Sequence, residues 1–116
     1  MILTVITLLA LPSLGNAGLD FRLTSEDIKY ISISPKMLGR YNVVMELFGP
    51  SYISLSKITG ENIGKQIDVY ISDTLIVSYP ITYKAGSSFI GVGEFNSMED
   101  AVAKLSSILT ALDGSG

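Results

Sequence analysis

The 116-residue chain contains no cysteine and no histidine. Without cysteine it can form no disulfide, no thiolate nucleophile and no lipid anchor attached through a cysteine. An exported form would therefore have to be held together by its apolar core alone. Without histidine the chain lacks the commonest general base and the commonest zinc ligand. Cysteine- and histidine-based catalysis are thus excluded before any motif is considered.

Basic residues are also few. The chain has 8 Lys and Arg against 11 Asp and Glu, a formal net charge of −3, and its charges are spread along the sequence without a basic run. Nucleic-acid binding domains are usually strongly basic on one face, and anionic membranes attract clustered Lys and Arg. We therefore expect no nucleic-acid partner and no attraction to an anionic membrane.

The chain begins with an apolar run from Ile2 to Leu11, which Pro12 interrupts. This run is too short to span a bilayer, because a membrane helix needs about 20 apolar residues. Small residues at Gly15 and Ala17 then suit the −3 and −1 positions of a cleavage site. The pattern predicts a signal peptide over residues 1–17 and mature protein from Gly18, without stable membrane insertion after cleavage. The alternative is an N-terminal strand or helix of the core.

Residues 18–116 have the length of one domain and alternate between strand-like and helix-like patterns. Alternating or continuous apolar runs predict strands, and Pro or Gly residues mark where elements begin and end. The expected strands are 30–34, 41–48, 67–72, 75–83 and 89–93, and the expected helices are a short one at 24–28, one from Gly49 to Gly60 and one at 97–112. Pro35 is expected to end the first of these strands.

The last helix has the clearest pattern. Ser97 followed by Asp100 resembles a capping box, and Gly114 is expected to end the helix. Its apolar residues follow the 3.6-residue period and are expected to cover one face, with Leu105 and Leu109 in the core: Met98, Ala101, Val102, Leu105, Ile108, Leu109 and Leu112. Similarly, Tyr52, Leu55 and Ile58, with Ile53 beside them, are expected to form the apolar face of the middle helix.

These elements predict an α+β fold: a mainly antiparallel sheet of about four to five strands with helices packed on one face. Their order resembles the head of the first periplasmic domain of SecD, an accessory subunit of the bacterial Sec translocase. The resemblance covers Phe21 to Leu112 and rests on the following segments: Phe21–Ile28, Thr59–Lys65, Ile67–Ser72, Leu75–Ile81, Gly86–Gly91 and Phe95–Ala101. Its turn motif consists of Thr59, Gly60, Gly64, Gly86 and Gly91, and a side chain at Gly60 or Gly64 is expected to strain the backbone.

The resemblance implies a stand-alone exported protein that handles polypeptide chains instead of transforming small molecules. Two motifs that would indicate other chemistry fail on their spacing or context. The segment Gly60–Lys65 has three residues between its glycines where a phosphate-binding loop has four, and it follows a helix where that loop follows a strand. The Ser54–Lys57 segment has the serine–lysine spacing of penicillin-binding proteins without their other motifs.

The carboxylates form no evident catalytic pair. Glu61, Asp68, Asp73 and Glu94 are isolated in sequence, at expected turns or solvent-facing strand positions. Two of them could still meet in space and act as acid and base, so a small envelope hydrolase is one alternative function. There is no calcium loop of alternating Asp and Asn. We expect no catalytic residue, no cofactor, no metal site and no enzymatic activity.

Aromatic residues supply the remaining signal. Tyr70, Tyr79, Tyr83 and Phe89 lie in or beside expected strands with few charges nearby. They either pack within the sheet or form a surface for extended apolar peptide, because tyrosine gives a large contact area at low entropic cost. Pro80 predicts an edge position or a bulge, and a sheet edge can accept an added strand. The candidate polypeptide-binding residues are therefore Tyr79, Pro80, Tyr83 and Phe89.

Together these features predict a periplasmic module that binds unfolded or exported polypeptide and is linked to translocation across the envelope. Another envelope protein is the alternative partner, in which case the chain is a structural subunit that docks on it.

Overall fold

The computed structural model describes residues 18–115, so the predicted signal peptide over residues 1–17 lies outside the described residues. The elements in chain order are β1 (Leu19–Leu23), β2 (Ile28–Lys36), the 3-10 helix η1 (Met37–Gly39), β3 (Arg40–Leu47), α1 (Gly49–Glu61), β4 (Gln66–Ile71), β5 (Thr74–Pro80), β6 (Phe89–Phe95) and α2 (Met98–Ser115). No helix within this part of the chain is long and apolar enough to cross a membrane.

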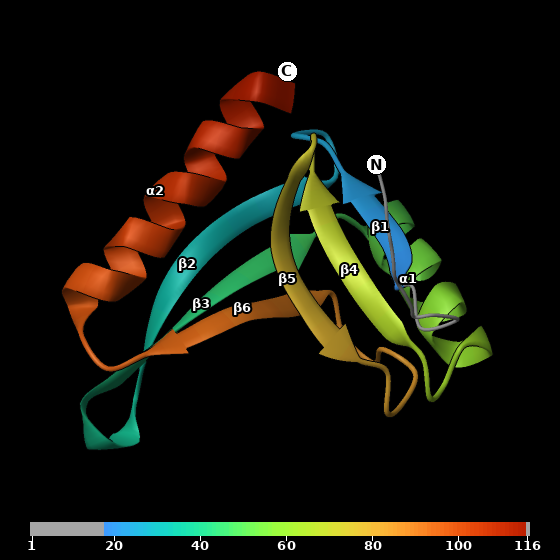
Figure 1. Ribbon diagram of the computed structural model, residues 1–116, viewed down its shortest axis with the longest axis horizontal. Helices are drawn as coiled ribbons and strands as arrows, with labels where there is room; N and C mark the ends of the chain where they lie inside the picture. The colour runs from blue at the N-terminus through green and yellow to red at the C-terminus, as the bar shows by residue number, and fades with distance from the viewer. Residues whose placement is uncertain (1–17, 116) are drawn as a thin grey trace, which may run out of the picture.

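The strands form two three-stranded sheets (Figure 1). In the first, ordered β1-β4-β5, β1 runs parallel to β4 and β5 runs antiparallel to it. In the second, ordered β2-β3-β6, all neighbours are antiparallel. The predicted α+β class with mostly antiparallel strands is confirmed. The described residues form six strands, because β1 lies where no strand was expected, and these strands are divided between two sheets.

The core lies between the two sheets, and the two helices flank it on opposite sides in Figure 1. Strict alternation explains which strand residues enter it, because successive side chains of a strand point to opposite faces. In both β3 and β4 every second residue is buried: Val43, Met45, Leu47, Ile67, Val69 and Ile71. Leu55 from α1 and Ile108 from α2 complete the core from the two sides.

Residues 25–27 form a turn where a short helix was expected. The N–H of Thr24 donates to Asp27 Oδ2 at 2.7 Å, and the N–H of Asp27 donates to the Thr24 carbonyl at 3.0 Å. Such local side-chain bonds compete with helix formation. Partial burial alone would raise the pKa of Asp27, but hydrogen bonds from Ser51 and Thr24 outweigh it and lower that pKa. Asp27 thereby ties the turn to α1, since Ser51 Oγ donates to its Oδ1 at 2.6 Å.

The predicted last helix is present, but the face it buries differs from the expected one. Ile108 is fully buried, whereas Leu109 is 50% exposed and Leu105 is only partly buried. The expectation that Leu109 belongs to the core is therefore wrong. The apolar stripe of α2 is wider than the surface that β3 and its neighbours cover. The helix also continues past Gly114.

The middle helix shows the same kind of shift. Leu55, Ser56 and Thr59 are its buried residues, while Ile53 is 65% exposed. Gly60 lies inside α1, so it does not end the helix as expected. An added Cβ there would meet Lys84 Cδ at 3.2 Å, a flexible side chain that can move.

Candidate functional site

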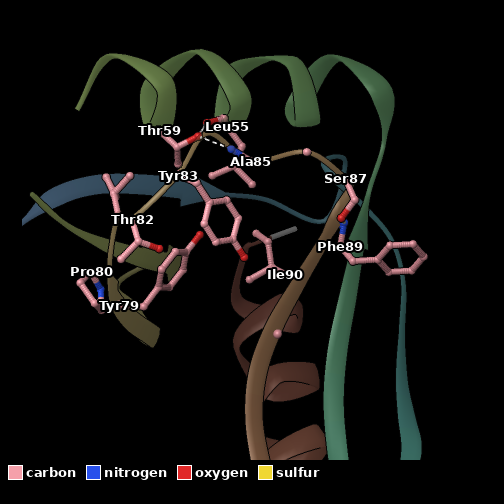
Figure 2. Close-up of a pocket in the computed structure, with 13 residues that line it drawn as sticks. Leu55, Thr59, Tyr79, Pro80, Thr82, Tyr83, Ala85, Ser87, Phe89 and Ile90 are labelled. Carbon is pink, nitrogen blue, oxygen red and sulfur yellow. Dashed lines mark hydrogen bonds between the residues drawn. The ribbon is translucent and has the colours of Figure 1, made fainter. Parts of the chain in front are cut away.

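A cavity of about 260 Å³ lies where the end of β5, the following loop and the start of β6 approach α1 (Figure 2). All four residues predicted to bind polypeptide, Tyr79, Pro80, Tyr83 and Phe89, belong to its lining. Among the described residues, none of the side chains in this lining is charged. We call this cavity the aromatic pocket.

Two tyrosines form one wall of the aromatic pocket, and Figure 2 shows the rings of Tyr79 and Tyr83 side by side. Tyr79 is partly buried, and this burial is the main cause that raises the pKa of its phenol. The nearby Tyr83 raises that pKa to a smaller extent. Tyr83 is 75% exposed and so can contact a ligand directly. Phe89 borders the cavity, but its ring points away from the tyrosines in Figure 2.

The loop that carries Tyr83 is fastened to α1 by a buried hydroxyl. The N–H of Ala85 donates to Thr59 Oγ1 at 2.8 Å, and that hydroxyl donates to the Leu55 carbonyl at 2.8 Å. Thr59 is 2% exposed, so solvent does not compete at the hydroxyl. Sequence reasoning included Thr59 only as part of a turn and did not foresee this bond, which requires α1 and the loop to be adjacent.

The start of the same loop is fastened to the segment before β4. The N–H of Ile81 donates to the Lys65 carbonyl at 2.7 Å, and the N–H of Gly64 donates to the Ile81 carbonyl at 2.8 Å. Gly64 has φ +93°, a conformation that L side chains rarely adopt, which supports the expectation that a side chain here would be strained.

The remaining glycines of the predicted turn motif lie around the aromatic pocket. Gly86 is in the loop and Gly91 lies inside β6, and both belong to the lining. An added Cβ at either position would meet open space. Sequence reasoning did not assign Ile81 and Ile90 to the site, although both are buried residues of the lining.

Pro80 lies on an edge strand, as predicted, because β5 pairs with β4 on one side only. The backbone N–H and C=O of Ile81 both bond to the segment before β4. Because the direction of these groups alternates along a strand, the backbone groups of Tyr79 also point to β4. Those of Ser78 and Pro80 point away from the sheet. Farther along β5, the Ile76 carbonyl accepts a hydrogen bond from Lys104 Nζ at 2.8 Å. Since proline has no N–H, much of this edge is closed to an added strand.

The four candidate carboxylates are dispersed, and none of them lines the aromatic pocket. Asp68 accepts a hydrogen bond from Ser78 Oγ at 2.7 Å. Glu94 lies 2.9 Å from Lys36 Nζ and 2.8 Å from Arg40 Nη2, and the bond from Lys36 is the main cause that lowers the pKa of Glu94. In the described part of the chain, no three acidic side chains converge to hold a metal ion.

No protein-family model and no curated protein sequence matches this chain. Two solved structures do match its fold, each with a TM-score of 0.58 and 16% identity over 73% of the chain. The fold is SecD-like. One structure is described as SecDF in the super-membrane-facing form, the other as a membrane component SecDF that enhances protein export. The chain spans 11% of the first protein and 38% of the second, so the SecD-like fold corresponds to a part of each.

Proposed function

We propose that the chain is an exported periplasmic module that binds unfolded polypeptide and acts in connection with protein export. The aromatic pocket carries this proposal, because the exposed Tyr83, the partly buried Tyr79 and Pro80 meet there without a charged neighbour in the lining. The SecD-like fold supports the link to export. In this proposal the chain corresponds to the head of the first periplasmic domain of SecD. Export is tested by sequencing the N-terminus of the protein isolated from the periplasm, where Gly18 is expected as the first residue.

The pocket suits a polypeptide better than a small polar substrate. Aromatic rings offer a large apolar contact to any side chain, and the phenol groups can bond to a peptide backbone. A tyrosine phenol is neutral at physiological pH, and burial raises the pKa of Tyr79 further, so its hydroxyl stays able to donate. Because the lining has no charge, binding should survive moderate salt concentrations and should have little sequence preference.

The position of the carboxylates favours binding over hydrolysis. The alternative, a hydrolase that uses two carboxylates, would need both groups beside the bound substrate, whereas Asp68 and Glu94 have their own partners outside the pocket. Our proposal is therefore a binding module without enzymatic activity. Docking on a folded envelope protein is the other outcome that the following experiment can reveal.

The experiment is a titration of fluorescently labelled unfolded peptides against the full chain, with circular dichroism as a folding control. Tyr83→Ser should weaken binding several-fold, because it removes an exposed ring from the pocket. Phe89→Ser should weaken binding less, since its ring points away from the tyrosines. Leu75→Ser is the matched control: Leu75 is a 50% exposed apolar residue of β5 outside the lining.

Equal losses for Tyr83→Ser and Leu75→Ser would show that the pocket is not the binding site. If no peptide binds at high micromolar concentrations of the protein, polypeptide binding itself is refuted and docking on a folded partner becomes the better explanation.

A further inference from the structure

The second sheet also has a free edge, at β2, which pairs with β3 alone within residues 18–115. The hydrogen bonds of β3 fix the direction of its backbone groups. The N–H of Leu47 donates to the Ser88 carbonyl next to β6, and the N–H of Phe48 donates to the Asp27 carbonyl next to β2. Because the direction of the backbone groups alternates along a strand, those of the residue before Leu47 point to β2, as those of Phe48 do.

That residue is Glu46, which is paired with Tyr30. The backbone groups of Tyr30 therefore face β3, and alternation turns those of Ile31 and Ile33 outward from the sheet. Pro35 occupies the next outward position, where its missing N–H costs the sheet nothing. The edge of β2 thus presents two successive N–H and C=O pairs, from Ile31 and Ile33.

An apolar groove of about 310 Å³ runs beside this edge, between β2 and the second half of α2. Its walls include Ile31 from the strand and Leu105 and Leu109 from the helix. Lys29 is the one charged residue in this lining, and Leu109 is 50% exposed. Figure 1 shows α2 lying alongside β2.

The edge and the groove are aligned for a single ligand. Ile31 is paired with the fully buried Met45, so its side chain points to the face of the sheet that α2 covers. In an added strand, the residue opposite Ile31 points to the same face. Its side chain would enter the groove while its backbone bonded to the edge.

We propose that the β2 edge and the groove along α2 form a second polypeptide site, which binds an extended apolar segment by strand addition. The proposal takes its ligand class from the proposed function, but it concerns a different surface. The outward amides select an extended backbone over a helix, whose own backbone groups are already bonded. The apolar lining selects apolar side chains at every second ligand residue.

The two edges of the molecule differ in this respect. On β5, Lys104 occupies the Ile76 carbonyl and Pro80 has no N–H to offer, which leaves Ser78 facing outward between them. On the β2 edge, the outward backbone groups of both Ile31 and Ile33 can bond to an added strand. The aromatic pocket therefore binds mainly through side chains, and the β2 edge reads the ligand backbone.

The test measures amide hydrogen exchange by NMR in the full chain, with and without a synthetic peptide of alternating valine and serine. At saturation, exchange of the Ile31 and Ile33 amides should slow by about tenfold or more, because the peptide carbonyls accept their N–H groups. The Ser32 amide, which already faces β3, should not change. A second probe is a pair of peptides N-methylated at alternate residues. The peptide whose methyl groups replace the N–H groups that face the β2 edge should lose binding, and the peptide methylated at the other residues should keep it.

Three variants localise the site. Leu109→Glu places a charge in the groove and Ile33→Pro removes one outward amide; each should weaken binding about tenfold. Ala103→Glu is the matched control, since Ala103 is exposed on the same helix and lies outside the groove lining. Circular dichroism confirms that each variant folds, and the N-methylated peptides test the site even if Ile33→Pro does not.

Several results would overturn this inference. Slow exchange of the Ile31 and Ile33 amides without peptide, at any dilution, would mean that another segment of the chain covers the edge. Protection that appears only at high protein concentration, together with dimers in analytical ultracentrifugation, would assign the edge to a second copy. Peptide binding that Tyr83→Ser weakens and Leu109→Glu leaves unchanged would refute the β2 site alone, while loss with Leu109→Glu alone would refute the aromatic pocket alone.

Discussion

Replacing Thr59 with valine tests whether one buried hydroxyl holds the loop that carries Tyr83. The hydroxyl accepts the N–H of Ala85 and donates to the Leu55 carbonyl, each at 2.8 Å. Valine has nearly the same shape, so no cavity is created. It leaves the Ala85 amide without an acceptor in a place where Thr59 is 2% exposed.

The expected loss follows from that unsatisfied amide. A buried donor without a partner costs about 1–3 kcal/mol, and Ala85 is only partly buried, so water can recover a share of the loss. We expect Thr59→Val to lower the free energy of unfolding by about 1–2 kcal/mol. For a domain of this size that corresponds to a fall in melting temperature of roughly 5–10 °C.

Thr110→Val is the matched control. Thr110 Oγ1 donates to the Ser106 carbonyl at 3.0 Å, the same bond to the preceding turn, but the residue is exposed and accepts no loop amide. Its valine variant should change stability by less than about 0.5 kcal/mol. Urea denaturation followed by circular dichroism measures both values, and amide exchange at Ala85 should be faster in Thr59→Val. Equal effects of the two substitutions would refute the reasoning.

Three further predictions concern the core, the turn and the second sheet. Ile108→Ala should cost about 2–5 kcal/mol because Ile108 is fully buried, whereas Leu109→Ala should cost less than about 1 kcal/mol; urea denaturation compares them. The lowered pKa of Asp27 means that its ionised form stabilises the fold above the unfolded pKa and that this contribution is lost as pH falls through the folded value. Asp27→Asn should therefore reduce the melting temperature at pH 7 and make little difference at about pH 2, and identical differences at both pH values would contradict the assignment. The pKa of Tyr30 is raised chiefly by its hydrogen bond to Glu46, so Glu46→Ala should lower that pKa in an ultraviolet absorbance titration.

Most strands and both long helices could be predicted because their residues satisfy a local rule. Ile67, Val69 and Ile71 alternate with polar neighbours, and all three are fully buried on one face of β4. The edge position of β5 was also predictable, since a proline cannot donate to a central strand.

Other features depend on contacts that the local pattern does not contain. Leu19–Leu23 becomes a strand because β4, far along the chain, supplies its parallel partner. On α2, apolar residues occupy more of the circumference than the sheet covers, so periodicity could not decide between Ile108 and Leu109. The turn at 25–27 shows local side-chain bonds prevailing over a weak helical preference.

The site was predictable to a similar degree. Tyr79, Pro80 and Tyr83 are close in sequence, so their meeting at one cavity required only that β5 lie at an edge. The direction of the Phe89 ring depends on the register of β6 against β3, which no sequence pattern fixed. The hydrogen bond between Thr59 and Ala85 depends on how α1 packs against the loop, so it could not be predicted from a threonine in a helical segment.

The parallel pairing of β1 with β4 has a consequence for the order of folding as the chain emerges. The first sheet cannot be assembled until residues 66–71 are available, and the second sheet requires β6, residues 89–95. Contacts between distant segments are slow to form because the intervening chain must first be closed into a loop. Most of the polypeptide therefore has to emerge before either sheet is complete. If the chain is exported in an unfolded state, as we propose, neither sheet is complete while the later segments are still crossing the membrane.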